Sequence, residues 1–306
     1  MFIDDNNMNI WFHYLIILAI LMLIVIWYKK QDLTPYYEGF SQESPYIFKS
    51  GDDIYDNFYV EIYDKLMGVD KQCSYEFDKI IDLTSPSKNK SVFLDICCGT
   101  GVLSGKLTEE GYNTYAIDKS DAMVEYTSNK YPNLHVKQGD VKDPILYEKG
   151  SFTHILNNGL GIYQFKNKET FFRNSYYWLR PGGYLILHLV DRDNFDTIIP
   201  GGKPPLLENP QMYSKKRITD TIIDFIDFTY KGSYDFSKIN DNLVTFKETF
   251  TDGLTHNVRQ NELTLYMEPL NEILRLALDT GFIIRNKANL KECSGDENQF
   301  IYILQR

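Results

Sequence analysis

Apolar and polar residues follow two alternating patterns along the chain from about residue 91 onward. Short apolar runs bounded by turn residues are typical of buried strands, whereas apolar residues three and four positions apart predict amphipathic helices. The segments that predict strands are 91–96, 112–118, 133–140, 151–158 and 184–191. Because helical segments separate these strands, the pattern predicts a doubly wound α/β fold with a parallel sheet.

The segment 192–267 interrupts this alternation with a proline-rich loop and further apolar runs. The runs that we interpret as antiparallel strands are 221–231, 242–251 and 256–267. Asp252-Gly253 lies between the last two and is a favourable hairpin turn. We therefore interpret 192–267 as an antiparallel β insertion. We expect it to cover the carboxyl ends of the parallel strands, where open α/β sheets bind ligands.

Further elements are predicted on both sides of the alternating region. Helices are expected at 53–67, ended by Gly68, and at about 75–83. Another helix is expected from Pro269 to Thr280, where Gly281 follows as a stop signal. The closing segments 282–287 and 299–306 predict two more strands, which bring the Rossmann-like sheet to seven.

The amino-terminal segment carries the strongest local signal, an uncharged apolar run of 18 residues from Ile10 to Trp27. As a helix this run would span roughly 27 Å, close to the ~30 Å hydrocarbon layer of a membrane. The predicted organisation is a leader at 1–9, a single-pass transmembrane helix at 10–28, a linker at 29–52 and an α/β domain at 53–306.

The charges on either side of the apolar run predict how the chain is oriented in the membrane. Lys29 and Lys30 follow the run, whereas the leader contains no Lys or Arg, so the positive-inside rule predicts that the α/β domain is cytosolic. A cleaved signal peptide is the main alternative, but it requires a basic leader, and this leader carries Asp4 and Asp5. A buried core helix is the other alternative.

Composition narrows the classes of function. The chain has 306 residues with Lys+Arg 32 against Asp+Glu 42, a formal net charge of -10. An acidic chain is poorly suited to binding nucleic acid through a basic face. The 4 cysteines form no CxxC pair, which argues against the common zinc sites and against a disulfide framework, so no metal site is predicted.

Residues 94–104 combine a strand, a tight glycine loop and the start of a helix. Gly99 and Gly101 allow the backbone to turn sharply and a ligand to lie against it, and the helix amino terminus presents free N–H groups. Asp118 ends the next strand, where a carboxylate can accept hydrogen bonds from both hydroxyls of a ribose. Asp140 ends the third strand.

Asp95, at the end of the first strand, discriminates between two kinds of nucleotide ligand. The stretch Gly99–Ser104 approaches a dinucleotide-binding fingerprint. A carboxylate at Asp95, however, would face the two phosphates of a dinucleotide, at a cost of a few kcal/mol if partly buried. S-adenosylmethionine carries an ammonium and a sulfonium, so the same carboxylate favours its binding. Helix caps at the strand ends remain the structural alternative for Asp95 and Asp118.

Four motifs, in this order, resemble those of class I S-adenosylmethionine-dependent methyltransferases. They are Asp95–Gly101, Asp118–Met123, Gly139–Val141 and Leu179–Leu185. The resemblance covers roughly residues 53–306. It implies that this region is a methyltransferase domain that uses S-adenosylmethionine to methylate an acceptor.

The resemblance also implies which residues surround the cofactor. They are Tyr63, Asp95, Cys97, Gly99, Gly101, Asp118, Lys119, Met123, Asp140, Val141 and Asn157. The residues of the first motif would line the methionine end, and Asp118 would hold the ribose. The adenine would be surrounded by Lys119, Met123, Asp140 and Val141. Asn157 would border cofactor and substrate. Cys97 replaces the first glycine of the usual motif, and Tyr63 resembles a cofactor-contacting tyrosine of small-molecule N-methyltransferases, although core packing is an alternative role for it.

No residue is identified as a catalytic base. His154 and His188 lie within predicted strands, where core histidines are more common than bases, and Cys97-Cys98 could in principle be a redox or metal pair. The predicted function is that of a membrane-anchored methyltransferase acting on a small-molecule or membrane-proximal acceptor. The alternatives are a catalytically silent S-adenosylmethionine-binding scaffold and an NAD-dependent oxidoreductase.

Overall fold

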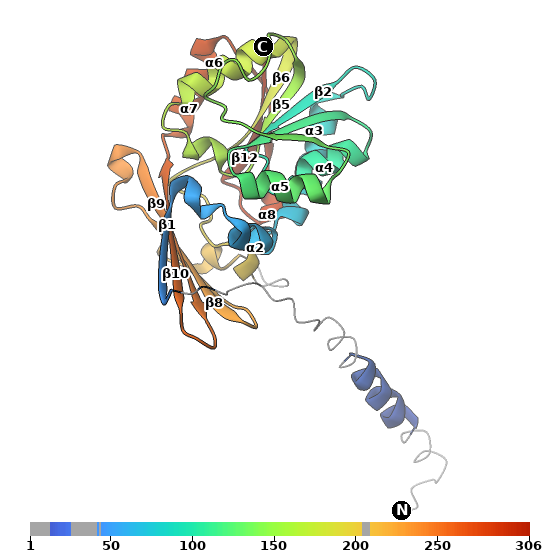
Figure 1. The fold of residues 1–306 in the computed structure, drawn as a ribbon, viewed down its shortest axis with the longest axis vertical. Helices are drawn as coiled ribbons and strands as arrows, with labels where there is room; N and C mark the ends of the chain where they lie inside the picture. The colour runs from blue at the N-terminus through green and yellow to red at the C-terminus, as the bar shows by residue number, and fades with distance from the viewer. Residues whose placement is uncertain (1–12, 26–41, 43, 204–208) are drawn as a thin grey trace, which may run out of the picture. The chain divides into compact units, whose positions relative to one another are not determined.

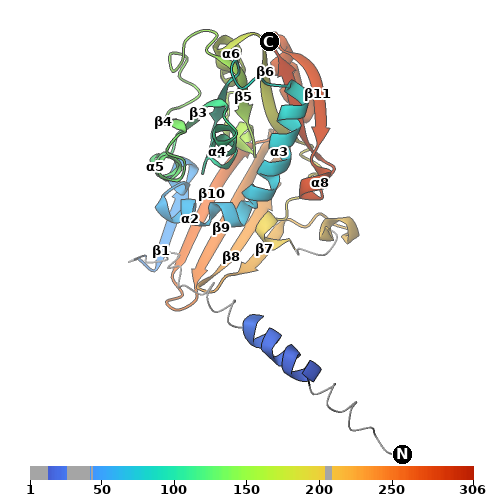
Figure 2. The same cartoon turned by 90° about the vertical axis from the view of Figure 1, so that its right-hand side faces the viewer.

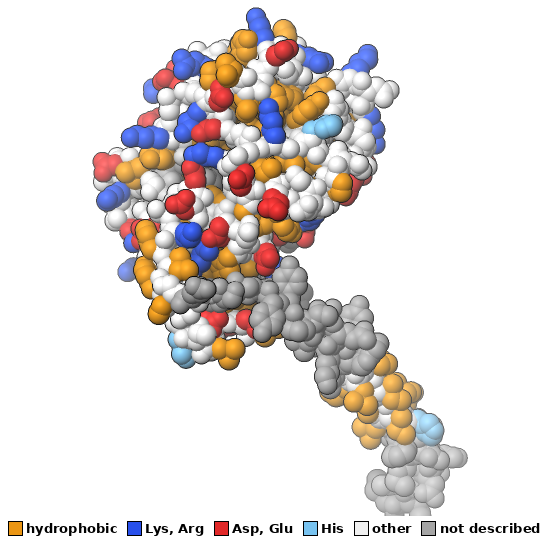
Figure 3. Space-filling model, viewed as in Figure 1, with side chains coloured by type: hydrophobic (Ala, Val, Ile, Leu, Met, Phe, Trp, Pro, Cys, Tyr) orange, Lys and Arg blue, Asp and Glu red, His pale blue; other side chains and the backbone are white. Residues whose placement is uncertain are grey.

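The computed structural model describes residues 13–25, 42, 44–203 and 209–306. The chain divides into two compact units, residues 1–39 and residues 40–306 (Figure 1). In the first unit, residues 13–25 form a helix whose large apolar side chains are exposed (Figure 3). The remaining residues of the predicted 10–28 span lie outside the described residues. Among the described helices, none combines the length and the apolar character needed to cross a bilayer.

The larger sheet of the second unit has seven strands. In spatial order they are β11 (Ile283–Asn289), β12 (Gln299–Gln305), β6 (Leu179–Val190), β5 (Phe152–Asn157), β2 (Val92–Ile96), β3 (Asn113–Asp118) and β4 (His135–Gln138). The strands from β6 to β4 are parallel, whereas β12 runs antiparallel to both β6 and β11. The short connection at 290–298 explains the β11–β12 pairing, because a parallel crossover needs a dozen or more residues.

Helices cover both faces of this sheet, as the strand–helix alternation predicts (Figure 1). They are α3 (Val69–Thr84), α4 (Val102–Glu109), α5 (Asp121–Lys130), α6 (Lys168–Trp178), α7 (Leu270–Thr280) and α8 (Lys291–Ser294). Successive residues of β2 enter two separate cores, since Phe93 packs in one apolar cluster and Leu94 in the other. This alternation confirms that the α/β sheet is Rossmann-like and buried on both faces.

The helix predicted at 53–67 is divided in two. A short 3-10 turn, η1 (Gly51–Ile54), precedes α2 (Asn57–Met67), because the Asp56 side chain caps α2 by accepting from the Tyr59 N–H at 3.2 Å. Gly68 ends α2 as expected, with φ of 59°. Other short 3-10 turns are η2 (Gly161–Gln164), η3 (Pro200–Gly202), η4 (Pro210–Tyr213) and η5 (Ile239–Asp241).

A second sheet of five strands follows the order β1 (Tyr46–Ser50), β10 (Val258–Tyr266), β9 (Leu243–Asp252), β8 (Phe228–Asp235) and β7 (Asp220–Asp224) (Figure 2). The antiparallel pairs β7–β8, β8–β9 and β9–β10 confirm the antiparallel character predicted for the insertion. Asp252 forms the β9–β10 turn, where its carboxylate accepts from the Leu254 and Thr255 N–H groups.

Two predicted segments are wrong in detail. The single strand expected at 221–231 is the hairpin of β7 and β8, whose turn contains no Gly, Pro or Asn to signal it. Within the predicted linker 29–52, residues Tyr46–Ser50 form β1, which pairs in parallel with β10. Alternate residues of β1, at both of its ends and at its centre, are exposed and the others are partly buried, so its apolar pattern is weak. Pairing with the distant β10 makes it a strand.

The surface of the second unit mixes charges of both signs. On the face shown in Figure 3, Lys and Arg side chains lie among Asp and Glu side chains. No broad basic surface appears on this face, in keeping with the acidic composition of the chain.

Candidate functional site

A cavity of about 990 Å³ lies at the carboxyl ends of β2 and β3. The second sheet contributes to the same cavity through β8, β9 and β10, while η1, α2 and α3 supply other parts of its wall. Its size lies at the upper end of the range for small-molecule sites, which is ~300–1,000 Å³. The two sheets together therefore enclose a space large enough for a nucleotide cofactor and a second molecule.

The loop after β2 is held in a fixed conformation by backbone contacts. The Cys98 N–H donates to the Ile117 carbonyl at 3.1 Å, and the Gly101 N–H donates to the Cys98 carbonyl at 2.9 Å. Three of its residues, Cys97, Gly99 and Gly101, have φ of 57°, 54° and 71°. Left-handed backbone of this kind favours glycine, so Cys97 adopts it at a small energetic cost.

Asp118 connects this loop to the end of β3. One carboxylate oxygen accepts from the Gly99 N–H at 2.9 Å, and the other accepts from the Ser120 N–H at 2.9 Å. Burial raises the pKa of Asp118, and these backbone donors counteract that shift. Each oxygen retains a further acceptor position, so the carboxylate can still bind hydroxyl groups of a ligand in the cavity.

Asp95 lies deeper, at the end of β2, and it also lines the cavity. Its side chain is buried and accepts a hydrogen bond from the Ser104 hydroxyl. Burial raises the pKa of Asp95 to about 7. Within the described ranges, no Lys or Arg forms an ion pair with it. A cationic ligand would therefore supply the charge that stabilises the ionised carboxylate, which fits the methionine end of S-adenosylmethionine.

The residues predicted near the adenine line the same cavity. Lys119 forms ion pairs with Asp52 and, at 3.9 Å, with Asp140. Met123 and Val141 are buried beside them, which provides an apolar surface for a flat ring. Their contacts with adenine stay a prediction.

Tyr63, Cys97 and Gly99 also line the cavity, whereas Gly101 and Asn157 do not. A Cβ atom at Gly101 would overlap Thr127, so this glycine permits close packing of the loop against α5. The Asn157 side chain is fully buried and donates to the Ile96 carbonyl at 3.0 Å. Asn157 thus joins β5 to β2, and its contact with the cofactor stays a prediction. The next residue, Asn158, lines the cavity.

The alternative roles considered for cysteine and histidine residues are not favoured. Burial, followed by the nearby Asp118 carboxylate, raises the pKa of both Cys97 and Cys98, which disfavours the reactive thiolate. In the part of the chain that the structure describes, no group of three His, Cys, Asp or Glu side chains could hold a metal ion. Burial lowers the pKa of His154 and His188 to about 4, so both rings are neutral at physiological pH.

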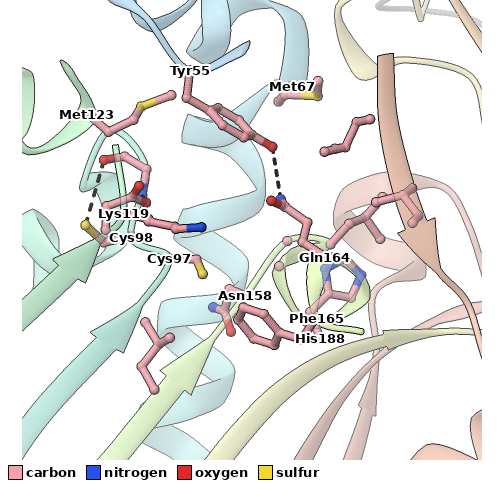
Figure 4. Close-up of a pocket in the computed structure, with 18 of the residues that line it drawn as sticks. Tyr55, Met67, Cys97, Cys98, Lys119, Met123, Asn158, Gln164, Phe165 and His188 are labelled. Carbon is pink, nitrogen blue, oxygen red and sulfur yellow. Dashed lines mark hydrogen bonds between the residues drawn. The ribbon is translucent and has the colours of Figure 1, made fainter. Parts of the chain in front are cut away.

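Sequence reasoning missed several residues of the cavity. Gln164 of η2 donates through its side-chain amide to the Tyr55 hydroxyl at 3.0 Å, so the two side chains meet within the cavity (Figure 4). Glu76 of α3 also lines the cavity. The sequence contains a signal for it, because its spacing places it on the same helical face as the buried Cys73 and Ile80. A carboxylate on an apolar helix face is unusual and indicates a polar site.

Comparison with known proteins supports this interpretation of the fold and the loop. Residues 93–183 match the model of the methyltransferase domain family. The chain is 29% identical over 154 residues to glycine N-methyltransferase of Rattus norvegicus, covering 42% of this chain and 48% of that protein. It is 30% identical over 110 residues to a dTDP-3-amino-3,4,6-trideoxy-alpha-D-glucopyranose N,N-dimethyltransferase of Streptomyces venezuelae, covering 36% of this chain and 44% of that protein.

Both matches thus cover less than half of the curated relative. Among solved structures, the CcbJ methyltransferase of Streptomyces caelestis shares the fold over 83% of this chain and 98% of its own, with a TM-score of 0.61 and 13% identity. Residues 93–183 therefore form part of a methyltransferase domain, as predicted, with S-adenosylmethionine as its cofactor. The family match favours the methyltransferase over the oxidoreductase alternative.

Proposed function

We propose that this protein transfers a methyl group from S-adenosylmethionine to the nitrogen of a small-molecule amine. The observation that carries the proposal is the shared cavity, in which Asp95 and Asp118 face the space enclosed by the second sheet. The relatives indicate the acceptor class, because glycine and an amino sugar both present an amine.

Several residues would hold the cofactor. Asp118 is oriented by the loop for the ribose hydroxyls, and Asp95 offers a buried carboxylate to the cationic methionine end. When bound, S-adenosylmethionine supplies a methyl group already activated by its positive sulfur. The protein then has to align the acceptor nitrogen with that carbon, within about 3–3.5 Å, and exclude water.

The second sheet provides the surface for the acceptor. The second sheet lines the cavity with Phe246 of β9 and with Leu263 and Leu265 of β10, and η3 adds Pro200. Apolar side chains of this kind exclude water from the reacting groups and fit an acceptor with an apolar portion. We accordingly assign the acceptor side of the cavity to the segment 192–267.

A turnover assay tests this function. We expect the full-length protein to bind S-adenosylhomocysteine at micromolar concentration, to bind no NAD, and to transfer labelled methyl groups to amines from a small-molecule extract. Leu263→Ala should raise the acceptor KM several-fold with S-adenosylhomocysteine affinity unchanged, because Leu263 lines the acceptor side. Thr264→Ala is the matched control, since that exposed side chain lies on the opposite face of β10. Cofactor binding with no methyl transfer to any extract would instead indicate a silent scaffold.

We also propose that the amino-terminal segment attaches the protein to a membrane, with the second unit in the cytosol. The proposal is supported by the 18-residue uncharged run at 10–27, by Lys29 and Lys30 after it, and by the exposed apolar side chains of the helix at 13–25.

Membrane attachment is tested by sedimentation with membranes after expression. The wild-type chain should sediment with membranes and resist extraction by carbonate. The variant I17R/L21R should move to the supernatant, because each arginine costs ~2.5–3.5 kcal/mol at the centre of a membrane helix. Glu110→Arg, an exposed charge change in the second unit, serves as the control. A wild-type chain found in the supernatant would refute the attachment.

A further inference from the structure

Glu76 is a carboxylate of the cavity that the proposed mechanism does not use. It lies on α3 and is 3% exposed. Its Oε1 accepts from the Gln72 side-chain amide at 2.7 Å, and its Oε2 accepts from the Asn158 side-chain amide at 2.9 Å. Both partners are neutral amides, so these hydrogen bonds position the carboxylate without balancing its charge.

The protein supplies no cation to this carboxylate from the residues that the structure describes. No Lys or Arg forms an ion pair with Glu76, and the nearby His188 is neutral. The Gln72 amide lies 3.5 Å from His188 Nδ1, and His188 Nε2 lies 3.0 Å from the Gln299 amide oxygen. The groups that contact Glu76 or its partners are therefore polar and carry no positive charge. Burial raises the pKa of Glu76 to about 7, as expected for a carboxylate without a cation.

Asn158 presents a second acceptor at the same place. Because its amide nitrogen donates to Glu76, its Oδ1 faces away from that bond, and this oxygen is buried without a hydrogen-bond partner. In the view of Figure 4, the Asn158 side chain lies between Cys97 and Phe165. A buried carbonyl oxygen without a donor is costly, so this position favours a ligand that brings N–H groups.

The positions of Glu76 and Asn158 in the fold relate them to Asp95 and to the end of the cavity where we propose methyl transfer. Asn158 directly follows β5, and Asp95 on β2 pairs in register with Leu156, two residues earlier on β5. Glu76 and Asp95 line the same cavity, and repulsion from Asp95 adds to the raised pKa of Glu76. The carboxylate of Glu76 and the carbonyl of Asn158 thus converge beside the methionine end of the cofactor site.

We propose that Glu76 and Asn158 form a binding subsite for an ammonium group. An ammonium has three N–H donors and one positive charge, which satisfy the free positions of both oxygens and the charge of the carboxylate. Two molecules of the proposed function carry this group. One is the methionine portion of the cofactor, and the other is the amine acceptor in its protonated form, which must release a proton before its nitrogen can accept the methyl group. The subsite therefore rests on the proposed function and refines it by naming the residues that select a cationic nitrogen.

Calorimetry with the full-length protein tests the subsite with two pairs of probes. S-adenosylhomocysteine carries the ammonium, whereas 5′-methylthioadenosine lacks it. For the acceptor side, hexylamine and its neutral counterpart hexan-1-ol are titrated into protein saturated with S-adenosylhomocysteine. Glu76→Gln should weaken the binding of one ammonium-bearing probe at least tenfold. The affinity for its neutral counterpart should stay within twofold of wild type. Whether S-adenosylhomocysteine or hexylamine is affected identifies the source of the ammonium.

Two further variants separate binding from folding. Glu248→Gln is the matched control, because Glu248 is an equally buried carboxylate that accepts from Tyr59, Tyr230 and Asn261 but does not line the cavity. It should leave all four probes unchanged. Asn158→Ala should weaken the same probe as Glu76→Gln, by about threefold or more.

The outcome that overturns the subsite differs from the one that overturns the function. If Glu76→Gln is folded, as judged by its thermal unfolding, and binds both ammonium probes within twofold of wild type, the subsite is refuted while the methyltransferase function stands. If the wild-type protein binds neither S-adenosylhomocysteine nor 5′-methylthioadenosine, the proposed function itself fails.

Discussion

Asp118→Ala is expected to weaken the binding of S-adenosylhomocysteine by about 100-fold. The carboxylate is the predicted acceptor for two ribose hydroxyls, and hydrogen bonds to a charged group contribute ~1.5–3 kcal/mol each. The substitution also removes the acceptor for the Gly99 and Ser120 N–H groups, so the glycine loop loses its connection to β3. Isothermal titration of the full-length protein measures the effect.

Asp140→Asn is the matched comparison for this prediction. Asp140 lines the same cavity and undergoes the same loss of charge, but its ion pairs are with the lysines Lys119 and Lys142, and it accepts no hydrogen bond from the glycine loop. We expect less than a fivefold change in affinity for this variant. Equal effects of the two substitutions would mean that Asp118 acts only through the overall charge of the cavity.

Gly101→Ala is expected to lower the free energy of unfolding by about 2–4 kcal/mol and to abolish measurable cofactor binding. The added Cβ would overlap the Thr127 methyl group and lie 3.1 Å from its hydroxyl. Thr127 in turn donates to the Gly99 carbonyl at 2.9 Å, so any shift of α5 also displaces the loop. Chemical denaturation and titration with S-adenosylhomocysteine measure the two effects.

Gly295→Ala isolates the contribution of backbone conformation. Gly295 ends α8 with φ of 72°, nearly the 71° of Gly101, but a Cβ atom there would meet nothing within 4 Å. This control should lower the free energy of unfolding by about 1 kcal/mol, the usual penalty for an alanine in left-handed backbone, and should leave cofactor binding intact. If both variants lost the same stability, the packing of Gly101 against Thr127 would not be the cause.

Local pattern was sufficient to predict the larger sheet, because its strands β2, β5, β6 and β12 contain apolar runs that the sequence shows directly. The loop at Asp95–Gly101 was recognisable for the same reason: a carboxylate, two glycines and a helix start lie within a few positions. Asp118 could be placed near this loop from the sequence, since the carboxyl ends of neighbouring parallel strands meet at one edge.

The sequence alone could not show which side chain at the end of β5 faces the cavity. Asn157 and Asn158 are adjacent and chemically identical, yet one joins two strands and the other lines the cavity. Successive side chains of an extended segment point in opposite directions, so an error of one residue exchanges the two roles.

Contacts between distant segments decided the remaining features. β1 pairs with β10 across more than two hundred residues, and the second sheet joins the cavity only when the chain is folded. Glu76, Asn158 and His188 come from three separate elements, and no spacing in the sequence relates them. The sequence by itself determined the α/β framework and the cofactor loop, because the residue patterns that predict them lie within short segments of the chain. The tertiary structure decided where the proposed acceptor side and the proposed ammonium subsite lie, because both proposals depend on which buried groups line the cavity and lack a partner.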